Sequence, residues 1–129
     1  MAAKVVDASA IAALLFGEPE AGSVADQLRD GQLFAPPLLW LEVANVCLKK
    51  MRRHPELRTS LRAAFRLLDG LTIERADVNH GEVLDMANNA GLTVYDASYL
   101  WLARKVDAAL VTLDQQLASA DATVPQKRV

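Results

Sequence analysis

Short apolar runs alternate with longer amphipathic stretches along the chain. The runs are rich in Val, Leu and Ile, and they predict short strands. They lie at 4–6, 33–35, 71–74 and 109–112, and a weak fifth candidate lies at 123–124. Strands of this composition are typical of a sheet that is covered on both faces.

Helical periodicity fills the intervals between these runs. Glycine follows several of the helical stretches, which is a common way for a helix to end. The predicted helices span residues 8–16, 20–30, 37–53, 55–69, 79–89, 96–105 and 114–120. Strands separated by helices indicate right-handed crossovers and a mostly parallel sheet. The two long central helices exceed what a minimal alternating fold requires, and we expect them to form an inserted pair.

Length and composition predict one domain that spans residues 1–129. The apolar fraction is 52% and the mean hydropathy is +0.12, which excludes a disordered chain. No run approaches the roughly 18 uninterrupted apolar residues of a membrane span, and we expect no secretory signal. The single cysteine, Cys47, excludes an internal disulfide framework and is expected to be buried. These features favour a cytoplasmic protein without a membrane partner.

The net charge of −2 limits the ways in which the protein binds other molecules. It argues against attachment to nucleic acid through bulk positive charge. It does not exclude a nuclease, because metal ions bring their own positive charge to a phosphate.

Four acidic residues occupy positions that a parallel sheet would bring together. Asp7 and Asp114 follow predicted strands, while Glu42 and Asp96 lie near the starts of helical stretches. Open α/β sheets bind ligands outside the carboxyl ends of their strands. Taken singly, each acid has an ordinary alternative role. The three aspartates would serve as helix caps, and Glu42 would be an acid favoured by the helix dipole.

A cluster of these carboxylates requires a compensating charge. Two like charges about 4 Å apart repel by roughly 4 kcal/mol at an effective dielectric constant near 20. Several such pairs would cost much of a domain's stability, which is typically about 5–15 kcal/mol. The acids must therefore stay partly protonated or bind cations. No His or Cys accompanies them in ligand spacing, which disfavours zinc and favours Mg²⁺ or Mn²⁺.

Three polar residues lie close enough in sequence to support the acids. Ser9 follows Asp7 by two residues, and Thr112 precedes Asp114 by two. Hydroxyls at these positions can orient a carboxylate or a water molecule. Asn45 lies three residues after Glu42, so both side chains project from nearly the same face of a helix. The alternative for Asn45 is an ordinary helix-surface or subunit-contact residue.

Four segments resemble, in order, the motifs of bacterial PIN domains. They are Val5–Ala10 with Leu14–Glu20, then Leu41–Val46, Leu92–Tyr99 and Leu110–Asp114. The resemblance is closest to the VapC toxins of type II toxin–antitoxin pairs, and it extends from about Lys4 to Ala120. All four acidic positions agree with the family pattern.

The resemblance implies a three-layer α/β/α sandwich with a short parallel sheet of about five strands and a protruding helical pair. It implies a homodimer that cleaves RNA with Mg²⁺ or Mn²⁺ and leaves a 5′-phosphate and a 3′-hydroxyl. It also implies a VapB-like antitoxin that covers the active site. Asp7, Asp96 and Asp114 would be the main metal ligands. Glu42 would bind the metal through water or help to activate the attacking water.

A basic cluster lies at the end of the first central helix. It consists of Lys49, Lys50, Arg52 and Arg53. These residues would contact the RNA backbone, or they would simply stabilise the helix carboxyl terminus. The apolar positions of the helical pair would either pack against the domain or form a groove for an antitoxin helix.

Other functions remain open on the sequence alone. A PIN-like fold also suits a housekeeping nuclease for RNA processing, or a catalytically silent module that binds RNA or a partner. A receiver domain is disfavoured, because no adjacent acidic pair follows the first strand and no Lys follows a later strand in the required place. Trp40 and Trp101 flank the second and third motifs, and we expect them to pack in the core rather than to line a substrate groove.

Overall fold

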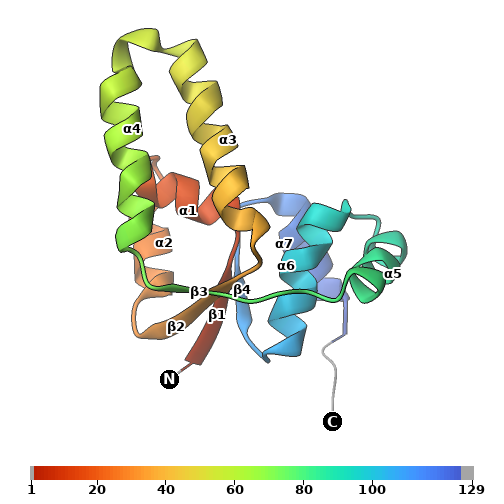
Figure 1. The fold of residues 1–129 in the computed structure, drawn as a ribbon. Coiled ribbons are helices and arrows are strands. Elements are labelled where there is room, and N and C mark those ends of the chain that lie inside the picture. Colours follow the sequence, from red (N-terminus) through yellow and green to blue (C-terminus); the bar gives the residue numbers. More distant parts are fainter. Residues whose placement is uncertain (1, 126–129) are drawn as a thin grey trace.

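A parallel sheet of four strands lies at the centre of the fold, in the order β3-β2-β1-β4 (Figure 1). The computed structural model describes residues 2–125. The strands are β1 (Ala2–Val6), β2 (Gly31–Ala35), β3 (Ile73–Arg75) and β4 (Ala109–Val111). β1 pairs with both β2 and β4, so its carboxyl end lies near the middle of the sheet edge. Val5 and Val6 of β1 are fully buried.

Helices cover both faces of the sheet, which confirms the predicted three-layer α/β/α architecture. α1 (Ala8–Leu15) and α2 (Ala21–Leu28) connect β1 to β2. α5 (His80–Ala90) and α6 (Val94–Lys105) connect β3 to β4 on the other side of the sheet (Figure 1). The chain runs from β1 to β3 along one direction of the sheet and returns past β1 to β4. Right-handed crossovers in these opposite directions place their helices on opposite faces.

The predicted fifth strand at 123–124 is wrong. Thr123 is the last residue of α7 (Gln115–Thr123), and the amide of Val124 donates to the carbonyl of Ala120 to close that helix. A short pair of β-branched residues gives only a weak strand signal. Here the apolar positions Leu117 and Ala120 are buried at helical spacing, and this packing continues the helix.

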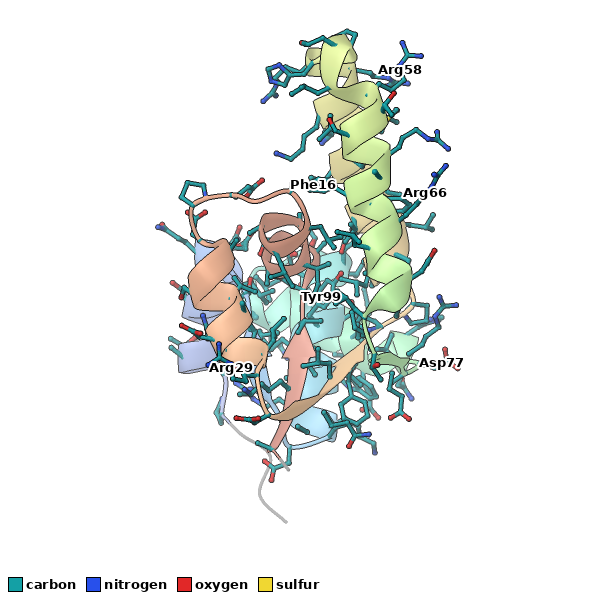
Figure 2. The ribbon with its side chains drawn as sticks, turned by 90° about the vertical axis from the view of Figure 1, so that its left-hand side faces the viewer. Phe16, Arg29, Arg58, Arg66, Asp77 and Tyr99 are labelled. Atoms are coloured by element: carbon teal, nitrogen blue, oxygen red, sulfur yellow. The ribbon has the colours of Figure 1, made fainter. Side chains whose placement is uncertain are left out.

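The central helical pair projects from the sheet, as the sequence predicts (Figure 1). α3 (Leu38–Arg53) is joined to α4 (Arg58–Arg66) by a 3-10 turn at Pro55–Leu57, and a second 3-10 turn at Leu67–Gly70 leads towards β3. No residue of α4 is fully buried. Arg58 and Arg66 extend from α4 into solvent (Figure 2). The second helix packs against α3, and its Phe65 is partly buried against the main core.

Both tryptophans are partly buried and pack against the core, in agreement with the prediction. The guanidinium of Arg75 lies 4.3 Å from the centroid of the Trp40 ring. Trp101 donates from Nε1 to Oε1 of Glu82 at 2.9 Å. Cys47 is only 4% exposed, as expected. Within residues 2–125, no helix is both long and apolar enough to cross a membrane.

Candidate active site

Asp7 is a buried carboxylate at the carboxyl end of β1. It is 4% exposed, and its backbone amide donates to the carbonyl of Val111 at the end of β4. Oδ1 accepts from Ser9 Oγ at 2.7 Å and from the amide of Ala10 at 3.0 Å. Oδ2 accepts from Thr112 Oγ1 at 2.5 Å. Asp7 also caps α1, through the bond from the amide of Ala10. The residue therefore serves as a helix cap and still lies at the carboxyl edge of the sheet.

The hydroxyls of Ser9 and Thr112 fix Asp7 in one orientation. Ser9 Oγ accepts from the amide of Leu113 at 2.9 Å, and Thr112 Oγ1 accepts from the amide of Asp114 at 3.0 Å. Each hydroxyl therefore receives a backbone hydrogen and gives its own to Asp7. Ser9 and Thr112, the two hydroxyl residues that the sequence suggested would orient a carboxylate, both contact Asp7. Their hydrogen bonds also join the end of β1 to the end of β4.

Glu42 lies in the second turn of α3 and accepts a hydrogen bond from Tyr99. The distance from Tyr99 Oη to Glu42 Oε1 is 2.5 Å. Tyr99 is 1% exposed and belongs to α6, so this bond joins two helices that are 57 residues apart. We did not predict Tyr99 as a site residue. Its position three residues after Asp96, on the same face of a helix, is the sequence signal that would have found it.

Asp96 and Asp114 occupy different positions at the starts of their helices. Asp114 caps α7, because its Oδ1 accepts from the amide of Leu117 at 2.9 Å. Asp96 is not the cap of α6. Thr93 takes that place and accepts from the amide of Asp96 at 3.1 Å. The helix thus begins two residues before the predicted start, and the Asp96 carboxylate is left without a capping role.

The carboxylates influence one another electrostatically. Burial raises the pKa of Asp7, and the charge of Asp114 adds to this against the hydrogen bonds from Thr112, Ala10 and Ser9. Burial also raises the pKa of Glu42, where the charges of Asp96 and Asp7 act against the Tyr99 bond.

The same pattern holds on α6. Burial raises the pKa of Asp96, and the charges of Asp114 and Asp7 raise it further. Burial, followed by the bond to Glu42 and its charge, raises the pKa of Tyr99, so the phenol stays protonated. Each of the four acids therefore lies near enough to at least one other for their charges to interact, and their role as a joint metal site stays a prediction.

No basic side chain neutralises this cluster in the described part of the chain. The ion pairs found there involve none of the four acids. The donor set is made only of carboxylate and hydroxyl oxygens, which suits a hard divalent cation. Between residues 2 and 125, however, no three His, Cys, Asp or Glu side chains surround one point closely enough to enclose an ion. Binding would therefore require the half-exposed Asp96 and Asp114 to turn towards the fixed Asp7.

The remaining predicted site residues lie outside this cluster. Asn45 is exposed on α3. Lys50 Nζ pairs with Glu18 Oε1 at 3.0 Å, whereas Lys49, Arg52 and Arg53 are exposed. Arg52 lies ten residues after Glu42, so it is about 15 Å farther along the helix axis. The structure does not bring the basic cluster into the acidic site.

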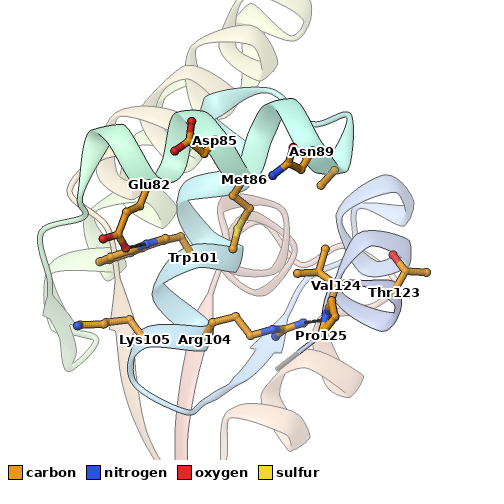
Figure 3. Close-up of a pocket in the computed structure, with 11 residues that line it drawn as sticks. Glu82, Asp85, Met86, Asn89, Trp101, Arg104, Lys105, Thr123, Val124 and Pro125 are labelled. Carbon is orange, nitrogen blue, oxygen red and sulfur yellow. Dashed lines mark hydrogen bonds between the residues drawn. The ribbon is translucent and has the colours of Figure 1, made fainter. Parts of the chain in front are cut away.

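A cavity of the described chain lies apart from the acids. It has a volume of about 700 Å³ and lies between α5, α6 and the end of α7 (Figure 3). Trp101, Met86 and Arg104 line it, and none of the four acids does. Arg104 is already engaged there, because its guanidinium donates to Oδ1 and to the carbonyl of Asp121.

Comparison with known proteins gives a consistent assignment. The family model described as PIN domain matches residues 4–122. Ribonuclease VapC3 of Pyrobaculum aerophilum is 37% identical over 123 residues, which cover 88% of this chain and 91% of the relative. The crystal structure of PAE2754 from Pyrobaculum aerophilum superposes with a TM-score of 0.75 at 28% identity, over 92% of this chain and 79% of that one.

A second solved structure shares the fold at lower identity. Mycobacterium tuberculosis VapC20, described as a toxin that cleaves the sarcin–ricin loop, superposes with a TM-score of 0.65 at 15% identity. The match covers 91% of this chain and 94% of that protein.

Proposed function

The chain belongs to the PIN-domain family, among the VapC ribonucleases, and we propose that it is a metal-dependent endoribonuclease that serves as the toxin of a VapBC-type pair. One observation carries the proposal. Four carboxylates from distant parts of the chain interact at one edge of the sheet, and no basic residue between 2 and 125 forms an ion pair with any of them. Such an arrangement is unfavourable unless cations compensate it.

Each of the four acids has a proposed role in metal binding or in activating water. Asp7, Asp96 and Asp114 would hold Mg²⁺ or Mn²⁺, with Asp7 as the fixed member because Ser9 and Thr112 orient it. Glu42 would ligate through water or accept a proton from the attacking water. When bound, the cation would lower the pKa of the attacking water and neutralise the negative charge that builds on the phosphate.

A direct test compares RNA from cells after brief induction of the wild type and of Asp7→Asn. Sequencing of RNA 5′ ends should reveal new ends with the wild type, and these should be absent with the variant. Asn is a good helix cap, so α1 should keep its start. New ends of equal abundance with both proteins would remove the metal assignment, and their absence with both would favour the silent binding module.

An antitoxin is the proposed partner, and the groove between α3 and α4 is its proposed binding place. A cavity of about 300 Å³ lies there, lined by apolar residues such as Leu48 and Phe65 together with Arg62 and Arg66. An amphipathic helix with acidic residues beside its apolar face suits this lining. Co-purification with the product of an adjacent small open reading frame should succeed with the wild type and fail with Phe65→Ala. Leu84→Ala, at an exposed apolar position of α5, is the control.

The proposal also includes a homodimer in the cytoplasm. Several large apolar side chains are exposed in the described chain, among them Leu41 at 77% and Leu67 at 62%. A second copy would cover part of this surface. Light scattering at two protein concentrations tests this part independently of cleavage.

A further inference from the structure

We propose that Tyr99 is a positioning residue that holds Glu42 in its working orientation. The inference rests on the proposed function and assigns a role to a residue outside the four acids. The phenol hydroxyl donates to Oε1 of Glu42 at 2.5 Å. Among the described residues, no other side chain or backbone group donates to this carboxylate. Tyr99 therefore occupies one oxygen and leaves the second for a water molecule or a cation.

Burial makes Tyr99 a rigid support. Its side chain is 1% exposed and belongs to the main hydrophobic core, and α6 packs against β1. Figure 2 shows Tyr99 inside the body of the protein, below the helical pair. An aromatic ring has only two side-chain torsions, and packing fixes both of them. The hydroxyl consequently has a defined position at the carboxyl edge of the sheet.

Glu42 needs such a support more than the other acids do. Asp7 is fixed by three donors, and one oxygen of Asp114 accepts from the amide of Leu117. Glu42 is half-buried in the middle of a helical turn, where it caps nothing. A glutamate also has one more rotatable bond than an aspartate, and ordering it costs more conformational entropy. The hydrogen bond from Tyr99 offsets this cost before a ligand arrives.

The bond also fixes the relative position of two helices. Tyr99 lies one turn after Asp96 on α6, and Glu42 lies on α3. One face of α6 thus carries a proposed metal ligand and the residue that positions another. A shift of α3 against α6 would move Glu42 away from Asp96, and the Tyr99 bond opposes this shift.

Tyr99→Phe removes the hydroxyl and keeps the ring, so it is the variant of choice. Mn²⁺ affinity is measured without RNA, by electron paramagnetic resonance of the free ion. We expect affinity to fall about tenfold, in line with the loss of a hydrogen bond to a charged group. We also expect kcat for RNA cleavage to fall while KM stays within about twofold, because the proposed function assigns Glu42 to the metal or the attacking water and not to RNA binding.

Tyr95→Phe is the matched control. Tyr95 lies on the same helix, is 62% exposed, and loses the same atom. It should keep the wild-type Mn²⁺ affinity and kcat. Unfolding temperatures of both variants separate a loss of positioning from a loss of folding.

A double-mutant cycle keeps the inference testable if Tyr99→Phe is unstable. In a Glu42→Gln background, Tyr99→Phe should change Mn²⁺ affinity by less than about twofold, since the carboxylate it positions is absent. If Tyr99→Phe kept the Mn²⁺ affinity and kcat of the wild type, the inference about Tyr99 would be overturned and the proposed function would stand. A wild-type protein that neither binds Mn²⁺ nor cleaves RNA would overturn the proposed function, and the inference with it.

Discussion

Thr112 Oγ1 donates to Asp7 Oδ2 across 105 residues of sequence. The same oxygen accepts the amide hydrogen of Asp114. One hydroxyl therefore links the backbone of one proposed metal ligand to the carboxylate of another. The position of the acidic cluster depends on this contact, because it fixes the end of β4 against the end of β1.

Replacing Thr112 with Val should destabilise the protein while keeping the shape of the side chain. Asp7 Oδ2 would lose its donor and the Asp114 amide its acceptor, and an unsatisfied buried group costs about 1–3 kcal/mol. Urea denaturation without metal measures the change in the free energy of unfolding. Thr123→Val is the control, because Thr123 is exposed at the end of α7 and its hydroxyl contacts only helix carbonyls. It should change stability by less than about 0.5 kcal/mol. Equal losses in the two variants would contradict a special role for Thr112.

The sequence predicts the strand ends and the acids that follow them. Asp7 and Asp114 are recognisable because a β-rich run stops at a residue that caps a helix well, and a parallel sheet then brings the two together. The Ser9 and Thr112 contacts follow from the same geometry. Local signals therefore suffice wherever a site residue sits at the boundary of an element.

The bond between Tyr99 and Glu42 could not be predicted in this way. Its partners lie inside two helices that are distant in sequence, and only the packing of α6 and α3 around the sheet brings them into contact. The prediction of a fifth strand was wrong for a related reason. Thr123 and Val124 have strand propensity, but the buried residues Leu117 and Ala120 of α7 favour a helix that continues to Thr123. Tertiary packing overrides local propensity in both cases.

Stability without metal should fall as the pH rises above about 4. Asp7, Glu42 and Asp96 have raised pKa values in the folded protein, with burial as the first cause. Between the ordinary pKa and the raised one, the folded state binds more protons than the unfolded state, so the free energy of unfolding decreases with pH. Melting temperatures in a chelating buffer from pH 4 to 7 measure this slope. Asp7→Asn should flatten it. An identical slope in the variant would show that Asp7 titrates normally.

Divalent ions should reverse this loss of stability. An ion present at about 100 times its dissociation constant should raise the free energy of unfolding by about 2.7 kcal/mol. Calorimetry with Mg²⁺ or Mn²⁺ at pH 7 measures the gain. Asp7→Asn should lose most of it, because the fixed ligand is gone. Asp26→Asn should keep all of it, since Asp26 is 71% exposed and paired with Arg29 on the surface. If both variants responded like the wild type, the acidic cluster would not be the binding place.

The exposed basic residues at the end of α3 should contribute to RNA binding through phosphate contacts. Lys49, Arg52 and Arg53 are free of ion pairs among the described residues, whereas Lys50 is engaged by Glu18 and lies over the ring of Phe16. Each phosphate contact that is lost should lower the slope of log K against log salt by about 1. Replacing the three exposed residues with Gln should therefore weaken binding most at low salt.

Binding is best measured with the Asp7→Asn protein, so that the RNA stays intact during a titration from 50 to 200 mM salt. Arg29→Gln with Lys105→Gln serves as a control, because it removes two exposed charges from other surfaces. The Lys50→Gln variant should instead lower stability by up to about 1 kcal/mol, as expected for a partly exposed ion pair, with a smaller effect on the salt slope. If the triple variant and the control changed the slope equally, the end of α3 would have only the structural role of stabilising its own carboxyl terminus.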